Sequence, residues 1–383
     1  MNRSTIIYVF IFLALMVGCS QGDANDVTQP PKLKDTPPKS SLKFNAINMI
    51  TEQKGWALAV QGDQNGILPN ALYSTHDGGQ SWETIPIPSL LRTGVYAQWD
   101  FRDDQTVWVI LQHQDAGKVY LTRDGGKTWF ERKVDVKGEI PELRSLDSNI
   151  AWVTDVTYAS GGSPNNNIEI HFTSDGGDTW QKIAEESNVP EVGQKGAAQP
   201  FSHETAWIPV TDMNSQPYAY YTLDRGAAWQ KKQLALPDQA EPPVRFRGLE
   251  YVNLGKGQLA YPIKVTTENG KNEIVIYTSE NNGNTWTAQQ TLPFEEEEWI
   301  NINIVDKSHG WVVKNSQASL YQFADGKETL VNEAERITGE EGSVFGGIDF
   351  VSRQRGFALI GDPNETGKSL YVTDDGGKSW EEK

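Results

Sequence analysis

One ten-residue motif recurs along the whole chain, and it limits the possible folds more than any other feature. The stretch YLTRDGGKTW runs from Tyr120 to Trp129, and YVTDDGGKSW runs from Tyr371 to Trp380. With five further copies, some of them degenerate, the Asp position of the motif falls at Asp77, Asp124, Asp175, Asp224, Asn281, Asp325 and Asp375. The spacings are 47, 51, 49, 57, 44 and 50 residues. A period of this size indicates repeated structural units.

A second marker accompanies the motif. In six of the seven units an aromatic residue opens a short apolar run before the motif, at Trp56, Trp108, Trp152, Trp207, Trp311 and Phe357. The fifth unit has Gln258 at this place. Short apolar or alternating runs are separated by turn-forming residues, and helical periodicity is missing over most of the chain. Four strands per unit in seven units predict an all-β fold, a seven-bladed β-propeller.

The chemistry of the motif fits a hairpin turn between the third and fourth strands of each blade. Asp124 can accept hydrogen bonds from N–H groups of its own turn. Gly126 supplies the positive φ that a tight turn needs, and Trp129 offers a large surface to bury. Each part of the motif has a structural role, so we interpret the seven Asp positions as structural and not as seven catalytic or metal sites.

The N-terminus is predicted to be a processing segment. An apolar run, Ile6 to Val17, is too short to span a bilayer and ends in MVGCS, where Cys19 is the only cysteine of the chain. This end resembles the lipobox of bacterial lipoproteins, which implies a signal peptide over 1–18 and lipidation of Cys19. An ordinary signal peptide with an incidental Cys is the alternative. We therefore expect a protein anchored in the cell membrane by lipid and facing the extracytoplasmic side.

The remaining boundaries follow from composition and from the repeat. Residues 19–41 are rich in Pro, Ser, Lys and Asp, which indicates a flexible tether. The propeller is expected over 42–383, with blades at about 42–90, 91–138, 139–190, 191–238, 239–293, 294–336 and 337–383.

The net charge restricts the possible partners. Lys and Arg number 34 and Asp and Glu number 51, so the formal charge is −17. Nucleic acid is excluded as the main partner because phosphate binding needs a basic surface. We expect a monomer that binds a protein or a glycan at the cell surface. The sequence shows no dense cluster of metal-ligating residues and no catalytic motif, so we expect neither a metal nor a cofactor.

The pattern [ST]-x-D-x-G-x-[ST]-W resembles the Asp-box, or BNR repeat, which occurs in sialidases, sortilin-like receptors, xyloglucanases and photosystem II stability and assembly factors. The coupling of KGWALAV to YSTHDGGQSW is most similar to the repeat of the last family. That resemblance implies a non-enzymatic factor that binds a macromolecule, as a scaffold or in assembly. The alternative is a carbohydrate-active hydrolase, sialidase-like or of another glycoside class. The Arg-Ile-Pro motif of sialidases is missing.

A set of polar residues on the first strands is the candidate ligand site. Eight residues before each second-strand marker lie Asn48, Asp100, Arg144, Gln199, Glu250, Asn303 and Asp349. Their neighbours are largely apolar, so we expect them to form a polar ring around the central channel. One interpretation is that they only line a water-filled channel, and the other is a site at the channel mouth for a cationic, polyol or basic peptide ligand. An acid/base pair for the hydrolase alternative would have to come from Asp100, Glu142, Glu250 or Asp349.

Overall fold

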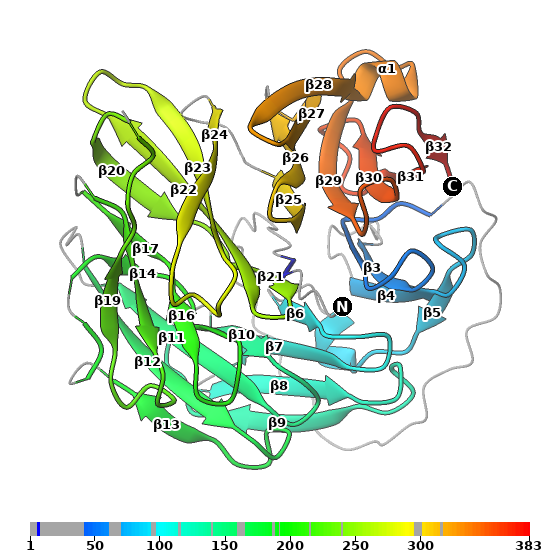
Figure 1. The fold of residues 1–383 in the computed structure, drawn as a ribbon. Coiled ribbons are helices and arrows are strands. Elements are labelled where there is room, and N and C mark those ends of the chain that lie inside the picture. Colours follow the sequence, from blue (N-terminus) through cyan, green and yellow to red (C-terminus); the bar gives the residue numbers. More distant parts are fainter. Residues whose placement is uncertain are drawn as a thin grey trace.

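The computed structural model describes residues 6–7, 42–60, 70–92, 97–113, 116–138, 141–158, 165–185, 188–190, 192–213, 216–238, 240–294, 301–314 and 317–383. Antiparallel sheets are arranged around a common centre in the order of the chain (Figure 1). The predicted all-β propeller is thus confirmed. The segments expected as signal peptide and tether lie outside the described residues, except for β1 (Ile6–Ile7), which pairs with the first strand of the second repeat.

Each of the first three repeats supplies one sheet whose strands pair in chain order. Their strands are β2 (Ala46–Met49), β3 (Gly55–Val60), β4 (Asn70–Thr75) and β5 (Glu83–Ile85); β6 (Gln98–Phe101), β7 (Val107–His113), β8 (Ala116–Thr122) and β9 (Phe130–Val134); and β10 (Glu142–Ser145), β11 (Ala151–Tyr158), β12 (Asn166–Thr173) and β13 (Gln181–Ala184). A short 3-10 helix, η1 (Ser89–Arg92), follows β5.

The sixth and seventh repeats follow the same plan. Their strands are β25 (Asn301–Asp306), β26 (His309–Lys314), β27 (Ser319–Ala324) and β28 (Lys327–Glu333); and β29 (Val344–Phe350), β30 (Gly356–Gly361), β31 (Ser369–Thr373) and β32 (Glu381–Glu382). A short α-helix, α1 (Ala334–Thr338), connects these two repeats.

The fourth and fifth repeats depart from this plan. The strands of the fourth are β14 (Gln194–Lys195), β15 (Gln199–Pro200), β16 (Ala206–Ile208), β17 (Val210–Asp212), β18 (Tyr218–Thr222) and β19 (Gln230–Gln233). Those of the fifth are β20 (Pro243–Gly248), β21 (Val252–Gly255), β22 (Gln258–Thr267), β23 (Asn272–Ser279) and β24 (Thr287–Pro293).

Pro209 divides the second strand of the fourth repeat into β16 and β17. The first part pairs with β15 and β18, whereas β17 pairs with β14 on one side and with β20 on the other. The described strands form seven sheets. The chain passes directly from β16, in the sheet that also contains β15, β18 and β19, into β17, in the sheet that also contains β14, β20 and β22. The prediction of seven separate blades is therefore wrong. When the two sheets that are linked through β16 and β17 are counted as one blade, the ring has six blades. That blade combines the fourth and fifth repeats.

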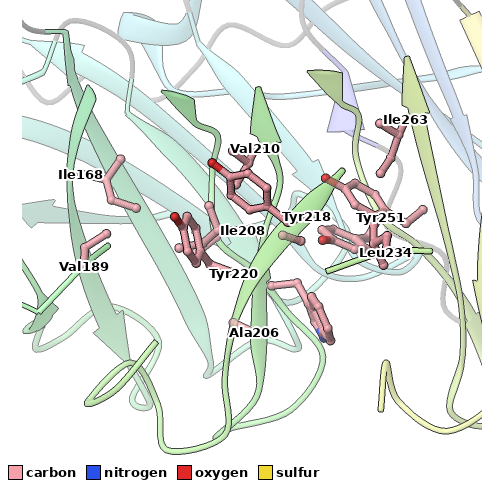
Figure 2. Packing of buried hydrophobic residues seen from close by; sticks show 14 of the residues in the cluster. Ile168, Val189, Ala206, Ile208, Val210, Tyr218, Tyr220, Leu234, Tyr251 and Ile263 are labelled. Atoms are coloured by element: carbon pink, nitrogen blue, oxygen red, sulfur yellow. The ribbon is translucent and has the colours of Figure 1, made fainter. Parts of the chain in front are cut away.

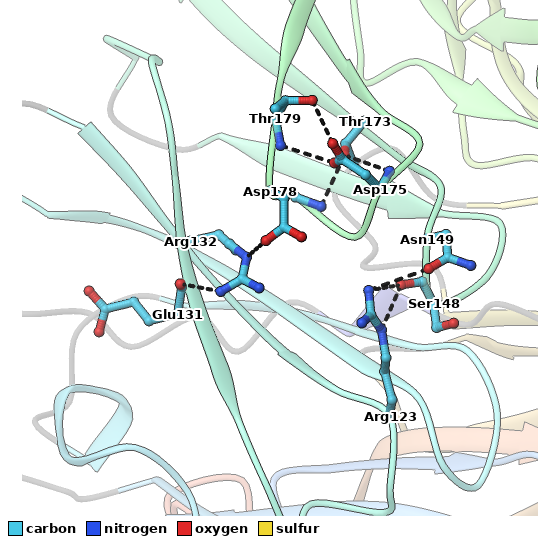
Figure 3. Close-up of polar contacts among 10 residues, drawn as sticks. Arg123, Glu131, Arg132, Ser148, Asn149, Thr173, Asp175, Asp178 and Thr179 are labelled. Carbon is cyan, nitrogen blue, oxygen red and sulfur yellow. Dashed lines mark hydrogen bonds and ion pairs between the residues drawn. The ribbon is translucent and has the colours of Figure 1, made fainter.

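A well-preserved Asp box is a turn held by one repeated set of hydrogen bonds (Figure 3). In the third repeat the box connects β12 to β13, and the hydroxyl of Thr173 donates to Asp175 Oδ1 at 2.8 Å. The N–H and hydroxyl of Thr179 donate to the two carboxylate oxygens of Asp175 at 3.0 and 2.6 Å. The same set surrounds Asp77, Asp124 and Asp375.

Degenerate boxes keep a turn by other means. Asn281 donates from its amide to the Thr285 hydroxyl at 3.0 Å while its oxygen accepts from the Thr285 N–H. In the sixth repeat Asp325 and Gly326 have φ of 47° and 81° and join β27 directly to β28. This is the geometry of a two-residue hairpin turn, which needs neither the hydroxyl nor the Trp of the box.

Backbone conformation and close packing both require glycine at the second glycine position of the box. Gly126 has a φ of 85°, and a Cβ there would lie 2.1 Å from Cγ2 of Ile85 in the preceding repeat. The box of one repeat therefore packs directly against the fourth strand of the repeat before it. Trp129 reinforces the contact, since its indole N–H donates to the Pro86 carbonyl at 2.8 Å.

Each second-strand aromatic is buried between repeats. The indole N–H of Trp56 donates to the Asp103 carbonyl in the second repeat at 2.9 Å. Trp311 stacks on Phe350 of the seventh repeat with ring centroids 3.7 Å apart. Because these contacts cross from one repeat to the next, burial of the aromatic rings holds the ring of sheets together.

Phe44 helps to close the ring between the last repeat and the first. Its N–H and carbonyl exchange hydrogen bonds with Lys368, which precedes β31, at 2.9 and 2.8 Å. The Phe44 side chain is 1% exposed and packs against Trp82 in one core with Phe357 and Leu370 of the seventh repeat. The first described residues of the propeller thus complete the last blade.

The box carboxylates make the stability of the propeller depend on pH. The hydroxyl and N–H of Thr179, with the hydroxyl of Thr173, lower the pKa of Asp175 to about 2. Since the folded pKa lies below the unfolded one, the ionised carboxylate stabilises the fold above about pH 4, and this contribution disappears as the pH falls through about 2.

We predict that Asp175→Asn lowers the free energy of unfolding by about 1 kcal/mol at pH 7, a value discounted for the exposure of this carboxylate. Asn281 shows that Asn can fill the turn, so the fold should persist. Urea unfolding of wild type and variant between pH 2 and pH 7 provides the measurement. The difference should vanish towards pH 2, and a difference that stays constant would contradict the assignment.

Candidate functional site

The first-strand polar residues face the neighbouring blades. Six of the seven are direct cross-strand partners of the second-strand aromatics, in the pairs Asn48–Trp56, Asp100–Trp108, Arg144–Trp152, Gln199–Trp207, Asn303–Trp311 and Asp349–Phe357. Directly opposed residues on antiparallel strands project to the same face of a sheet. The polar side chains therefore project, like the aromatic rings, towards the adjacent repeat. The fifth repeat lacks this pairing, and Glu250 lies between β20 and β21.

Four of these residues bond to the backbone of the next repeat. In each case a side-chain oxygen accepts from the N–H that follows the equivalent position one repeat later. The pairs are Asp100 with Ser145 at 2.6 Å, Gln199 with Tyr251 at 2.6 Å, Asn303 with Phe350 at 3.2 Å and Asp349 with Met49 at 2.5 Å. The last pair joins the seventh repeat to the first, so the bonded series runs across the closure of the ring.

Burial separates the set into two groups. Asn48, Asp100, Arg144, Gln199 and Asp349 are buried, while Asn303 is half-buried and the Glu250 side chain is 39% exposed. The side chains of the five buried members are therefore largely shielded from solvent, and whether the set binds a ligand stays a prediction. Burial raises the pKa of Asp100, against the opposing effect of its hydrogen bond to Ser145.

Arg144 cannot make this hydrogen bond, because a guanidinium has no acceptor for a backbone N–H. It binds the carboxylates of Glu142 at 3.0 Å and of Glu250, two repeats away, at 2.8 Å. The connection between the third and fourth repeats is made instead by Thr154, whose hydroxyl accepts from the Ala198 N–H at 2.9 Å. The structure thus brings together Arg144 and Glu250 from the predicted set, with Glu142 beside them.

The carboxylates proposed for acid/base catalysis are all engaged. Asp100 and Asp349 hold backbone N–H groups of neighbouring repeats, and Glu142 and Glu250 share Arg144. Within the described part of the chain, no group of three or more His, Cys, Asp or Glu residues could hold a metal ion. No helix among the described residues is long and apolar enough to cross a bilayer.

Exposed apolar side chains point to a different surface. Six large hydrophobic residues of the described chain are exposed, and three of them lie at the union of the fourth and fifth repeats: Val192 at 50%, Met213 at 72% and Val244 at 45%. We call this surface the junction face and define it by these three residues. The other three, Phe130, Leu223 and Leu330, lie in different repeats.

The sheet topology brings the three apolar residues to one edge. Val192 precedes β14, Met213 follows β17, and Val244 is the second residue of β20. Gln194 at the start of β14 pairs with Thr211, and Asp212 at the end of β17 pairs with Phe246. The three strand ends therefore meet. A hollow of about 420 Å³ lined by Glu241, Pro242, Glu268 and Asn269 lies beside the start of β20 and the end of β22.

A buried core that includes Tyr218 and Tyr220 (Figure 2) contacts the segments that carry the junction face. The hydroxyl of Tyr218 donates to Asp212 Oδ2 at 2.7 Å, and burial together with this bond raises the Tyr218 pKa. The Tyr220 hydroxyl donates to the Val192 carbonyl at 3.1 Å, and Tyr218 packs edge-on against Phe246 at 5.2 Å. The exposed residues thus sit on strand ends that a buried core fixes in place.

Sequence patterns gave two signs of this surface. The spacing of 57 residues between Asp224 and Asn281 is the longest of the six, and Pro209 interrupts an apolar second strand. A proline removes a ladder hydrogen bond and is confined to sheet edges and irregularities. The pairing of β17 with β20 could not be foreseen from either sign.

A family profile for the BNR/Asp-box repeat matches residues 371–382, which contain the box of the seventh repeat. The chain therefore carries a BNR/Asp-box repeat. No curated protein matches the sequence significantly.

Solved structures with similar folds have different activities. A structure of YCF48 bound to D1 peptide is 16% identical over 87% of this chain and 91% of that chain, with a TM-score of 0.48. A structure from a study of two prolyl endopeptidases is 10% identical over 89% of this chain and 49% of that chain, with a TM-score of 0.55. A Trypanosoma rangeli sialidase is 15% identical over 64% of this chain and 47% of that chain, with a TM-score of 0.37. At these identities the likeness concerns the fold and leaves the activity undecided.

The bond between Asp349 and the Met49 N–H yields a stability prediction. Asp349→Ala leaves that N–H buried and unpaired, so we expect the free energy of unfolding to fall by about 2–3 kcal/mol. Asp349→Asn keeps an oxygen acceptor and should cost less than half as much. Chemical denaturation gives the values, with the exposed Glu341→Ala as control. Equal stability of Asp349→Ala and the control would refute the structural role.

Proposed function

We propose that this protein is a lipid-anchored, extracytoplasmic propeller that acts as a non-enzymatic binding or scaffold factor, and that its partner is a protein bound at the junction face. The observation that carries the proposal is the gathering of Val192, Met213 and Val244 on three neighbouring strand ends. Contiguous exposed apolar side chains on a soluble domain are typical of interaction sites. The remaining exposed large apolar residues of the described chain are dispersed and have no such neighbours.

Two further features support a binding role. The polar groups that a hydrolase would need at the channel are occupied in joining the repeats or in the Arg144 ion pairs. The sequence resemblance to photosystem II stability and assembly factors, carried by the Gly-aromatic run and the TxDGGxTW box, also implies a factor without enzymatic activity. We propose an assembly or scaffold role of that general kind, with the partner specified only as a protein.

The anchor follows from the sequence and is proposed on that basis. MVGCS with a single cysteine places the lipid on Cys19, and residues 20–41 would separate the propeller from the membrane. We expect labelled palmitate to be incorporated into wild-type protein in cells and not into Cys19→Ser. The variant should leave the membrane fraction, whereas retention of label or of membrane attachment by the variant would contradict lipidation at this residue.

Capture from source membranes tests the binding role. The bait is the full protein in three forms: wild type, Val192→Ser/Met213→Ser/Val244→Ser, and the matched control Phe130→Ser/Leu223→Ser/Leu330→Ser. All three changed residues of each variant are exposed, so the variants should fold, which circular dichroism and thermal unfolding verify. We expect one protein to be retained by wild type and control and lost from the junction variant, and to bind again after purification.

Two results would count against the proposal. Equal retention of the partner by all three baits would exclude the junction face. Retention of glycans only, or turnover of a glycoside substrate by wild-type protein that Glu142→Gln or Glu250→Gln abolishes, would favour the hydrolase alternative.

A further inference from the structure

We infer that Met213 is a modification site of the junction face. A two-electron oxidant such as hydrogen peroxide or hypochlorous acid converts its thioether to the sulfoxide, and the sulfoxide weakens binding of the partner. The inference deepens the proposed function. Its effect on binding rests on that function, whereas the modification itself can be measured on the protein alone.

The propeller contains very few oxidisable sulfur atoms. The whole chain has four Met residues and one Cys. Met1 and Met16 belong to the predicted signal peptide, and Cys19 is the residue proposed to carry the lipid. Met49 and Met213 are the sulfur-containing residues that remain in the predicted propeller. Since Met is oxidised at its sulfur, a mild oxidant has two methionine targets there.

Burial distinguishes these two methionines. Met49 lies on β2 and is 2% exposed. Its sulfur packs closely against the next strand, because a Cβ added at Gly55 of β3 would overlap Met49 Sδ. Met213 is 72% exposed, the highest value among the exposed large hydrophobic side chains of the described chain. Because susceptibility to oxidation follows exposure, Met213 is the sulfur that an oxidant in solution reaches.

Backbone contacts fix the position of Met213 independently of its side chain. The Met213 N–H donates to Asp212 Oδ1 at 2.7 Å, and Asp212 Oδ2 accepts from the Tyr218 hydroxyl at 2.7 Å. Asp212 is also the cross-strand partner of Phe246 on β20, and both Tyr218 and Phe246 are buried. The Met213 side chain thus extends into solvent from an anchored strand end. An added oxygen would therefore change the surface without disturbing the fold.

The chemical step needs only the oxidant and the exposed sulfur. A lone pair of Met213 Sδ attacks one oxygen of hydrogen peroxide, so that an S–O bond forms and the O–O bond breaks. The departing oxygen takes up the proton of the transferred one and leaves as water. Sulfur loses two electrons and the peroxide gains them. With hypochlorous acid the O–Cl bond breaks instead, and chloride and a proton leave.

The product changes the character of the junction face. A sulfoxide is polar, whereas the thioether is apolar. An apolar partner surface would have to displace water from the S–O group without replacing its hydrogen bonds, which costs binding free energy. The proposed extracytoplasmic location also places Met213 outside the thiol pool that keeps the cytoplasm reducing. Oxidation therefore gives the junction face a means of releasing its partner.

Mass spectrometry of the oxidised protein tests the modification site. The detergent-purified full protein is treated with hydrogen peroxide, and the peptides that contain Met213 and Met49 are quantified over time. In the folded protein we expect the Met213 sulfoxide to form about tenfold or more faster than the Met49 sulfoxide. In urea the two rates should become similar, because both residues are then exposed. Equal rates in the folded protein, or an unreactive Met213, would overturn the inference.

Three variants link the oxidation to binding. Met213→Leu keeps an apolar side chain of similar volume without sulfur, Met213→Gln introduces a polar group, and Leu223→Gln is the matched control at another position, 56% exposed. Peroxide is removed before the captured and purified partner is added. We expect oxidation to weaken wild-type binding by about tenfold and to leave Met213→Leu unchanged. Untreated Met213→Gln should bind as weakly as oxidised wild type, and Leu223→Gln should bind like untreated wild type.

The outcomes separate the inference from the proposed function. Unchanged binding by wild-type protein whose Met213 is fully oxidised, or equal weakening of wild type and Met213→Leu by peroxide, would overturn the inference and leave the proposed function standing. Failure of untreated wild type to capture any partner would overturn the proposed function, and mass spectrometry would still decide the modification site. Thermal unfolding of oxidised and untreated wild type should coincide, and a lower midpoint after oxidation would overturn the assignment of the change to the surface.

Discussion

The structure depends on a hydrogen bond that four of the seven repeats make to the next. A side-chain oxygen on the first strand of one repeat accepts a buried N–H from the first strand of the following repeat, as Asp100 does from Ser145 and Asp349 from Met49. The sheets of most repeats share no strand, so a propeller needs contacts of this kind beside the burial of its aromatic rings. The acceptor must be an uncharged or anionic polar side chain. It must also be short enough to bond to the next repeat without extending across the channel. These demands account for Asp, Asn and Gln at the bonded positions without any ligand.

Arg144 occupies an equivalent first-strand position but does not make this hydrogen bond. It cannot accept an N–H, so the third repeat is joined to the fourth by Thr154. The guanidinium is satisfied instead by Glu142 and Glu250. The polar interior is therefore explained by the architecture, and the recognition surface is to be sought outside it, where the repeat is interrupted. There β17 pairs with β20, and exposed apolar residues lie on the neighbouring strand ends.

Sequence reasoning reached the parts of the fold that repeat. The box, with Asp175 between Thr173 and Thr179, and the second-strand aromatics such as Trp56 have one structural role each, so their recurrence predicts the all-β propeller. Six of the seven polar residues lie on first strands, whereas Glu250 lies between β20 and β21. The alternation of polar and apolar residues shows that Asn48 and its neighbours lie on opposite faces of the sheet. Only the assembled ring shows that both faces of a sheet contact neighbouring blades. The junction depends on long-range pairing of β17 with β20. Pro209 indicates an interrupted strand but does not determine which strand β17 pairs with.

Hydrogen exchange of the full protein with and without its captured partner tests the central claim most directly. If the interior is architectural and the junction face is the recognition surface, the partner will slow exchange at the backbone amides of residues 210–213 and 243–248. Exchange at residues 142–145 and 249–253, which adjoin the channel, will stay unchanged. Protection confined to the channel segments, with none at the junction strands, would contradict the account.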